Sequence, residues 1–289
     1  MATLLDFRRR IRSVKNTQQI TRAMKFISAA QLRRAQEAAL AARPYARELA
    51  RVLRSTMSRI DEPQHPLLAK REEKTILTIV LAGERGLAGA FNANILRKAS
   101  EFFRSNRDKK ILTIPVGKKG RDSLRKAGFK FAGEYVNVLA KVDFGVAREI
   151  SEKVEELYGK QEIDGVYIIF SEFKTVMTAD LVVEKLLPVE AIREDEQGGA
   201  ETNQADYIYE QPEEQILDKL LPRYIETQVL RAMLESSAAE HAARMTNMES
   251  ATKNAGEVIE ALTLHMNKVR QAAITREIIE IVSGAASTA

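Results

Sequence analysis

The chain has no cysteine among its 289 residues, which excludes disulfide bonds, thiolate metal sites and cysteine nucleophiles. Its only histidines, His65, His241 and His265, are widely separated, so a histidine-built metal site is not expected. No apolar run approaches the roughly 18 to 20 residues that a membrane-spanning helix requires. A content of 45% hydrophobic and 29% charged residues is typical of a globular protein. The start of the chain lacks the apolar stretch of a secretory signal, which favours a cytosolic location.

Helix-breaking residues are nearly absent from both ends of the chain. There is no glycine before Gly83, and Pro44 is the only proline among the first 62 residues. After Pro222 there is no further proline. We therefore predict one long helix over residues 3–60, with a bend or change of register at Pro44, and another over residues 223–283.

The apolar residues of both predicted helices recur at intervals of three, four and seven, which makes narrow stripes. A narrow stripe on helices of about 58 and 60 residues, each near 90 Å long, favours a two-stranded coiled coil over a globular core. The stripe residues are Phe7, Ile11 and Val14; Ala23, Ile27 and Ala30; Leu49, Leu53, Met57 and Ile60; Leu221, Ile225, Ala232 and Ala239; and Val258, Leu262, Val269 and Ala272.

The middle of the chain has a different pattern. Residues 75–81, 111–116 and 166–170 are short β-branched runs of the kind buried in parallel sheets. Helix-like stretches over residues 92–105 and 147–158 lie between them. Alternating strands and helices predict a small α/β domain with a largely parallel sheet. Because long helices enter and leave this domain, we expect the two helices to run antiparallel.

Charge is distributed unevenly along the chain. Residues 1–60 carry 14 Lys or Arg against three acids, a net charge of +11, so the remainder carries −6 of the total of +5. Residues 190–218 contain ten acidic residues and a single basic residue, Arg193. Such asymmetry indicates a partner of opposite charge, although a solvated helix face is an equally simple explanation. Binding of nucleic acid is one hypothesis, and the cations would be Arg8, Arg9, Arg10 and Arg12. Aromatic residues for base stacking do not accompany them.

Glycine-rich segments follow two of the predicted strands. The glycines of Gly83 to Gly89 are spaced three and three, unlike a dinucleotide fingerprint, so a tight strand-to-helix turn is favoured. A nucleotide-binding α/β enzyme with a helical dimerisation arm stays open as the alternative. Gly117 to Gly120 is better explained as a polar loop than as an anion site. No catalytic, cofactor-binding or metal-binding constellation emerges.

Several long motifs resemble the gamma subunit of F-type ATP synthases, bacterial type. They cover nearly the whole chain, and agreement at both ends is improbable by chance. The motifs are Ile11 to Lys25 (IRSVKNTQQITRAMK), Arg43 to Ala46 (RPYA), Gly86 to Asn92 (GLAGAFN), Tyr207 to Glu210 (YIYE), Ala242 to Met245 (AARM) and Asn267 to Ala285 (NKVRQAAITREIIEIVSGA).

This resemblance implies a fold of mixed class, α/β plus all-α. A long antiparallel two-helix coiled coil from the N- and C-termini would form a shaft over residues 1–62 and 211–289, with an inserted Rossmann-like α/β foot domain over 70–210. It implies a central rotor shaft that transmits torque between the membrane c-ring and the catalytic alpha/beta ring. Proton transport would thereby be coupled to ATP synthesis or hydrolysis.

The implied partners are the alpha and beta subunits of the catalytic ring, the epsilon subunit and the c-ring, with one copy of this chain per complex. No cofactor and no nucleic acid are implied. The chain would have no catalytic residues of its own, and its membrane association would be peripheral. No transit peptide is visible, so we expect the cytoplasmic face of a bacterial inner membrane.

The resemblance also implies roles for individual residues. Contacts with beta subunits are implied for Met24, Lys25, Arg270, Gln271, Thr275 and Glu277. Contacts with the c-ring are implied for Tyr207, Tyr209 and Glu210, and a role in the stability of the coupling helices for Arg244. A mainly apolar tip is formed by Ile278, Ile279, Ile281 and Val282. The chain departs from many members at Ala88, which stands where they carry cysteine, so thiol chemistry is excluded there.

Overall fold

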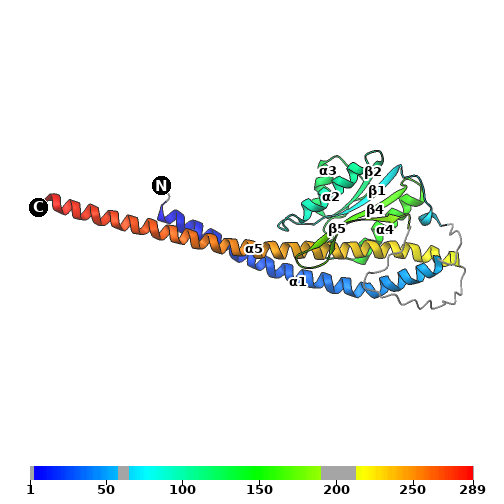
Figure 1. Cartoon of the computed structure of the whole chain (residues 1–289), viewed down its shortest axis with the longest axis horizontal. Coiled ribbons are helices and arrows are strands. Elements are labelled where there is room, and N and C mark those ends of the chain that lie inside the picture. Colours follow the sequence, from blue (N-terminus) through cyan, green and yellow to red (C-terminus); the bar gives the residue numbers. More distant parts are fainter. Residues whose placement is uncertain (1–2, 58–64, 190–212, 289) are drawn as a thin grey trace. The chain divides into compact units, whose positions relative to one another are not determined.

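The computed structural model describes residues 3–57, 65–189 and 213–288. Two long helices dominate it, α1 (Leu4–Met57) and α5 (Glu213–Thr288) (Figure 1). The chain divides into two compact units, one of residues 1–29 with 244–289 and one of residues 30–243. Each unit therefore contains a part of both helices.

The unit of residues 30–243 contains a five-stranded sheet in the order β3-β2-β1-β4-β5. Its first four strands are parallel, and β5 is antiparallel to β4. The predicted largely parallel sheet is thus confirmed, whereas the two edge strands β3 and β5 were not predicted. The strands are β1 (Thr75–Leu81), β2 (Lys110–Val116), β3 (Lys130–Phe131), β4 (Gly165–Phe173) and β5 (Ala179–Leu187).

Both faces of the sheet are covered by helices. Because successive side chains of a strand point to opposite faces, Leu77, Ile79 and Leu81 of β1 join one hydrophobic cluster and Val80 joins the other. The first cluster includes α4, and the second includes α2 and α3. The helices are α2 (Phe91–Ser105), α3 (Lys118–Lys126) and α4 (Phe144–Gly159), and a short 3-10 helix, η1 (Pro66–Leu68), precedes β1.

In this unit the long helices belong to the globular core. Leu53 of α1 and Leu221, Ile225 and Met233 of α5 are fully buried in the same cluster as the strands. Burial on several sides of α5 shows that the prediction of a narrow coiled-coil seam is wrong here. The physical reason is that α5 packs against the sheet domain as well as against α1.

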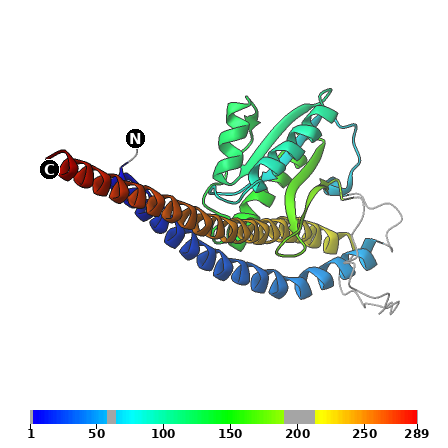
Figure 2. The same ribbon diagram turned by 60° about the vertical axis from the view of Figure 1, so that its left-hand side comes forward.

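The unit of residues 1–29 and 244–289 is an antiparallel helix pair (Figure 2). The Phe7 and His265 rings lie 5.0 Å apart, and Gln18 Nε2 donates to the backbone oxygen of Thr252 at 3.3 Å. The later residue of α1, Gln18, contacts the earlier residue of α5, Thr252, so the two helices run in opposite directions. The predicted antiparallel coiled coil is confirmed.

The buried face of α1 in this pair differs from the predicted stripe. Ile27 is 61% exposed, and Ala23 and Ala30 are also exposed. Thr21 and Ser28 are buried instead. The stripe prediction is wrong at these positions because hydroxyl and small side chains, rather than apolar ones, occupy the helix contact.

Neither proline of the long helices ends a helix. Pro44 lies inside α1, and Pro222 lies nine residues after the start of α5 at Glu213. The helix predicted to begin at residue 223 therefore begins earlier. Within residues 3–57, 65–189 and 213–288, no helix has the length and apolar character needed to cross a membrane.

Candidate functional site

The loop after β1 contains Glu84, whose carboxylate reaches the N-terminus of α3. Glu84 Oε2 accepts a hydrogen bond from the Lys118 backbone nitrogen at 3.0 Å, at the N-terminus of α3. Glu84 Oε1 accepts from the backbone nitrogens of Val138 at 3.0 Å and Leu139 at 3.4 Å. Glu84 is 8% exposed. The chain thus supplies its own anion to the helix terminus.

The same loop leaves little room around its first glycine. A Cβ atom on Gly83 would lie 2.8 Å from the Glu240 side chain and 2.9 Å from Asn92 Oδ1. Asn92 Oδ1 also accepts a hydrogen bond from the Gly83 nitrogen at 2.7 Å, which ties the loop to α2. The Glu240 and Asn92 side chains crowd Gly83, so a nucleotide-binding enzyme is not favoured. The predicted tight strand-to-helix turn accounts for Gly83, which is crowded, and for Gly89, which has a φ of 56°, but places no such demand on Gly86.

The segment Gly117 to Gly120 is not the polar loop that we predicted. Helix α3 begins at Lys118, and Gly117 precedes it with a φ of 98°, a left-handed conformation that favours glycine. A Cβ atom there would lie 1.8 Å from the backbone oxygen of Ala82. The prediction failed because the helix is short and its anionic partner, Glu84, comes from a distant part of the chain.

Met24 and Lys25 lie on the helix pair of the first unit. Both are half-buried, and Lys25 Nζ forms an ion pair with Glu249 Oε1 at 2.6 Å. One turn away, the Thr21 and Thr252 hydroxyls are 2.8 Å apart. Lys25 is thus held to α5 through its amine, and Met24 adjoins this polar contact between the helices.

The other residues with implied beta-subunit contacts lie farther along α5. Arg270, Gln271, Thr275 and Glu277 are all exposed. At 1.5 Å per residue, Arg270 lies about 30 Å along α5 from Glu249, so these residues and the pair at Lys25 are two separate surfaces. Thr275 Oγ1 donates to the Gln271 backbone oxygen at 2.9 Å, an ordinary helical contact.

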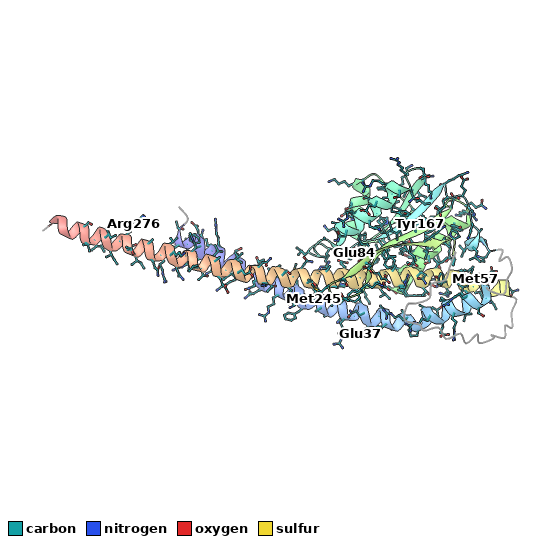
Figure 3. All side chains as sticks on the ribbon, in the orientation of Figure 1. Glu37, Met57, Glu84, Tyr167, Met245 and Arg276 are labelled. Atoms are coloured by element: carbon teal, nitrogen blue, oxygen red, sulfur yellow. The ribbon has the colours of Figure 1, made fainter. Side chains whose placement is uncertain are left out.

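The end of α5 extends past the beginning of α1 (Figure 3, near Arg276). Its large apolar side chains are exposed, as the sequence predicts for a tip. The exposed fractions are 55% for Ile278, 58% for Ile279, 70% for Ile281 and 61% for Val282. Exposed apolar side chains gathered at a helix end indicate a surface for a partner.

The remaining predicted residues fall into two groups. Arg244 is buried, at 7% exposure, within α5. Tyr207, Tyr209 and Glu210 lie outside the described residues. The sequence did not identify three buried or half-buried carboxylates, those of Glu84, Glu155 and Glu235. Their surroundings are made by contacts between residues far apart in the chain, so no local pattern marks them.

The fold is shared with chains of known ATP synthase structures. A chain in the cryo-EM structure of the Euglena gracilis mitochondrial ATP synthase (OSCP/F1/c-ring, rotational state 3) is 19% identical, with a TM-score of 0.68, over 99% of this chain and 94% of that one. A chain in the Tetrahymena thermophila mitochondrial ATP synthase central stalk/c-ring structure is 23% identical, with a TM-score of 0.60, over 80% of this chain and 99% of that one. The fold therefore defines a class, the long antiparallel helix pair with an inserted α/β domain.

Sequence comparison identifies the family. The family model described as ATP synthase matches residues 3–288. The ATP synthase gamma chain of Solibacter usitatus is 49% identical, and that of Pelotomaculum thermopropionicum is 46% identical, each over 99% of both chains. The chain belongs to the ATP synthase gamma chain family.

Proposed function

We propose that this chain is the central rotor shaft of an F-type ATP synthase. It transmits torque between the membrane c-ring and the catalytic alpha/beta ring, and so couples proton transport to ATP synthesis or hydrolysis. The observation that carries this proposal is the 49% identity to a gamma chain over 99% of both chains. Identity along the full length supports the same division into a helical shaft and an α/β foot.

The physical chemistry of the helix pair supports a role in rotation. Backbone hydrogen bonds along helices of 54 and 76 residues, interrupted within each helix by a single proline, resist bending, which a torque-bearing element needs. The exposed isoleucines at the end of α5 make contacts without directional bonds. Such contacts change little in energy as a shaft turns inside a sleeve of catalytic subunits, whereas fixed hydrogen bonds would resist rotation.

We propose two surfaces of the helix pair for the beta subunits. The first is at Met24 and Lys25, where the +11 charge of residues 1–60 attracts an acidic loop. The second is at the exposed side chains of Arg270, Gln271, Thr275 and Glu277 on α5. Their separation of about 30 Å along the helix fits contacts with two different levels of the catalytic ring.

The foot is proposed to meet the epsilon subunit and the c-ring, with Tyr207, Tyr209 and Glu210 at the c-ring and Arg244 in support of the coupling helices. The chain is non-catalytic by family, and catalysis is assigned to the beta subunits. Its place is proposed to be peripheral, at the cytoplasmic face of a bacterial inner membrane, with one copy per complex.

Reconstitution tests this function. We expect the complex to lose ATP-driven proton pumping when this chain is omitted and to recover it when the purified full chain is added. The assay measures ATP hydrolysis and acidification of vesicles in parallel. A complex that couples equally well without the chain would refute the proposal.

A substitution at Met24 tests the first surface. Met24→Lys adds a cation beside an acidic loop, an attraction of about 1 to 4 kcal/mol at 4 Å for effective dielectric constants between those of water and a protein surface. This attraction favours one angular position, so we expect proton pumping to fall more than ATP hydrolysis. Ser105→Lys adds the same charge at an exposed position of α2 and is expected to change neither. Equal losses of both activities in Met24→Lys would contradict the assignment.

A further inference from the structure

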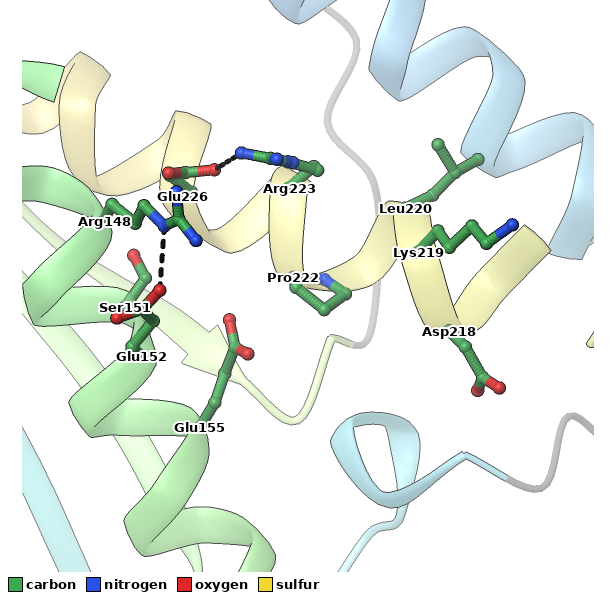
Figure 4. A pocket seen from close by; sticks show the side chains of 10 residues that line it. All are labelled: Arg148, Ser151, Glu152, Glu155, Asp218, Lys219, Leu220, Pro222, Arg223 and Glu226. Carbon is green, nitrogen blue, oxygen red and sulfur yellow. Dashed lines mark hydrogen bonds and ion pairs between the residues drawn. The ribbon is translucent and has the colours of Figure 1, made fainter. Parts of the chain in front are cut away.

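An open cavity of about 570 Å³ lies between α4 and the first turns of α5, within the unit of residues 30–243 (Figure 4). None of its charged residues belongs to the surfaces proposed above for the beta subunits or the c-ring. Its charged lining comprises four carboxylates and three basic side chains. They are Glu152, Glu155, Asp218 and Glu226, with Arg148, Lys219 and Arg223.

The two arginines of the cavity are each already paired with a carboxylate. Arg148 Nε lies 2.8 Å from Glu152 Oε1, and Arg223 Nη1 lies 2.7 Å from Glu226 Oε2. Glu155 makes no hydrogen bond or ion pair with any residue of the described chain. The cavity therefore presents Glu155 without a cation of its own.

Glu226 lines the same cavity and carries one carboxylate oxygen without a partner among the described residues. Its side chain is 5% exposed, and the Oε1 atom is buried without a hydrogen-bond partner among the described residues. A buried carboxylate oxygen without a donor is costly, so it favours the arrival of one. The pKa of Glu155 is raised to about 7, mainly by burial and further by the negative charges of Glu152 and Glu226.

We propose that this cavity receives one positively charged side chain, a Lys or Arg of a partner protein chain, held between Glu155 and Glu226. When Glu155 is ionised, the four carboxylates exceed the three basic groups by one charge, so one monovalent cation neutralises the lining. A multivalent amine would overcompensate it. Among the described residues, no cluster of three or more His, Cys, Asp or Glu has the arrangement of a metal site.

The proposal predicts that binding depends on pH. A cation binds the ionised form of Glu155, and the ionised fraction of a group with a pKa near 7 rises about tenfold from pH 6 to pH 8. The other charged groups that face Glu155 are Arg148 and Glu152 from α4 and Asp218, Lys219, Arg223 and Glu226 from α5. His65, whose Nε2 atom lies 3.4 Å from Asp218 Oδ1, also titrates, so a variant of Glu155 is needed to separate the two.

The test uses the isolated full chain, n-butylguanidinium as the probe and the neutral n-butylurea as its control. Carboxyl carbon NMR of 13C-labelled glutamate follows the midpoint of Glu155. We expect butylguanidinium to lower that midpoint from about 7 to below about 6 and to bind about tenfold more tightly at pH 8 than at pH 6. Equal midpoints with the two probes would overturn the proposal, and this arm needs no variant.

Variants identify the site. Glu155→Gln is expected to remove the tenfold pH dependence, and Glu226→Gln to weaken binding at both pH values. Glu101→Gln, an exposed position on α2, is expected to bind as the wild type does. Unchanged affinity and pH dependence in Glu155→Gln would overturn the proposal.

The assembled complex distinguishes the source of the cation. Carbodiimide and glycine ethyl ester modify protonated carboxyls, so an occupied Glu155 should react at least fivefold more slowly in the complex than in the isolated chain, while Glu101 reacts equally in both. Protection in a buffer whose sole amine is glycine ethyl ester, present equally with the complex and with the isolated chain, supports a partner side chain. Protection only after spermidine is added, or none at all, refutes that source. Because the probe titration uses the chain alone, its failure is distinguishable from failure of the rotor function.

Discussion

The stability of the chain is expected to depend on pH through Glu235, a half-buried residue of α5. Its Oε2 atom is buried without a hydrogen-bond partner among the described residues. Burial raises the pKa of Glu235 to about 7, and Glu172 adds to this effect while Arg231, Arg43 and Lys174 oppose it. The Arg231 guanidinium does not neutralise Glu235 fully because its Nη2 atom donates to Glu184 Oε2 at 2.8 Å.

The direction in which stability changes with pH follows from the protonation of Glu235 in the folded and the unfolded chain. Below pH 4.5, Glu235 is protonated in both the folded and the unfolded protein. Between pH 4.5 and about 7, the unfolded chain releases the proton while the folded chain keeps it, so stability falls as pH rises and is constant above that window. A difference of about 2.5 in pKa corresponds to at most about 3 kcal/mol. Partial solvent access reduces the expected loss to between about 1 and 3 kcal/mol.

Glu235→Gln removes this ionisation. We expect the variant and the wild type to be equally sensitive to urea at pH 4.5, and the variant to be more stable by about 1 to 3 kcal/mol at pH 8. Urea unfolding followed by circular dichroism at several pH values measures the difference. Glu101→Gln, at an exposed site, is the control and should show no such trend. A difference between Glu235→Gln and wild type that is the same at all pH values would refute the reasoning.

Three further substitutions test the local packing. Glu84→Gln places an amide donor against backbone donors and should cost about 1 to 3 kcal/mol of stability in urea unfolding; an unchanged midpoint would contradict the anion role of this carboxylate. Gly83→Ala should cost a similar amount through overpacking, whereas Gly86→Ala, with no atom within 4 Å of its new Cβ, should change stability by less than about 0.5 kcal/mol; similar effects of both would argue against the close approach. Replacing both Thr21 and Thr252 by valine should leave the helix pair at least as protected from amide hydrogen exchange as the wild type, and faster exchange would show that the hydroxyl pair is needed.

The presence of the two long helices and the bounds of α1 to within three residues could be predicted because they depend on local composition, whereas α5 begins ten residues before its predicted start. The scarcity of glycine and proline before Gly83 and after Pro222 predicts helices, and α1 and α5 occupy these regions. The β-branched runs likewise identify the cores of β1, β2 and β4. Edge strands were missed, because β3 has two residues and β5 is exposed at its start and mostly buried only in its last four residues, with no regular alternation.

Contacts between distant segments decided the rest. Spacing places Ala23 and Ile27 on a seam, yet the structure buries Thr21 and Ser28, since the facing surface of α5 offers the Thr252 hydroxyl and closely packed small residues. The buried or half-buried carboxylates Glu84, Glu155 and Glu235 depend on partners from other elements. The sequence alone therefore determined the family, the helices and the central strands, because these follow from local composition and shared motifs. Only the tertiary structure determined which helix face is buried and which carboxylates change their pKa, because solvent exclusion and charge act between residues that the chain brings together from afar.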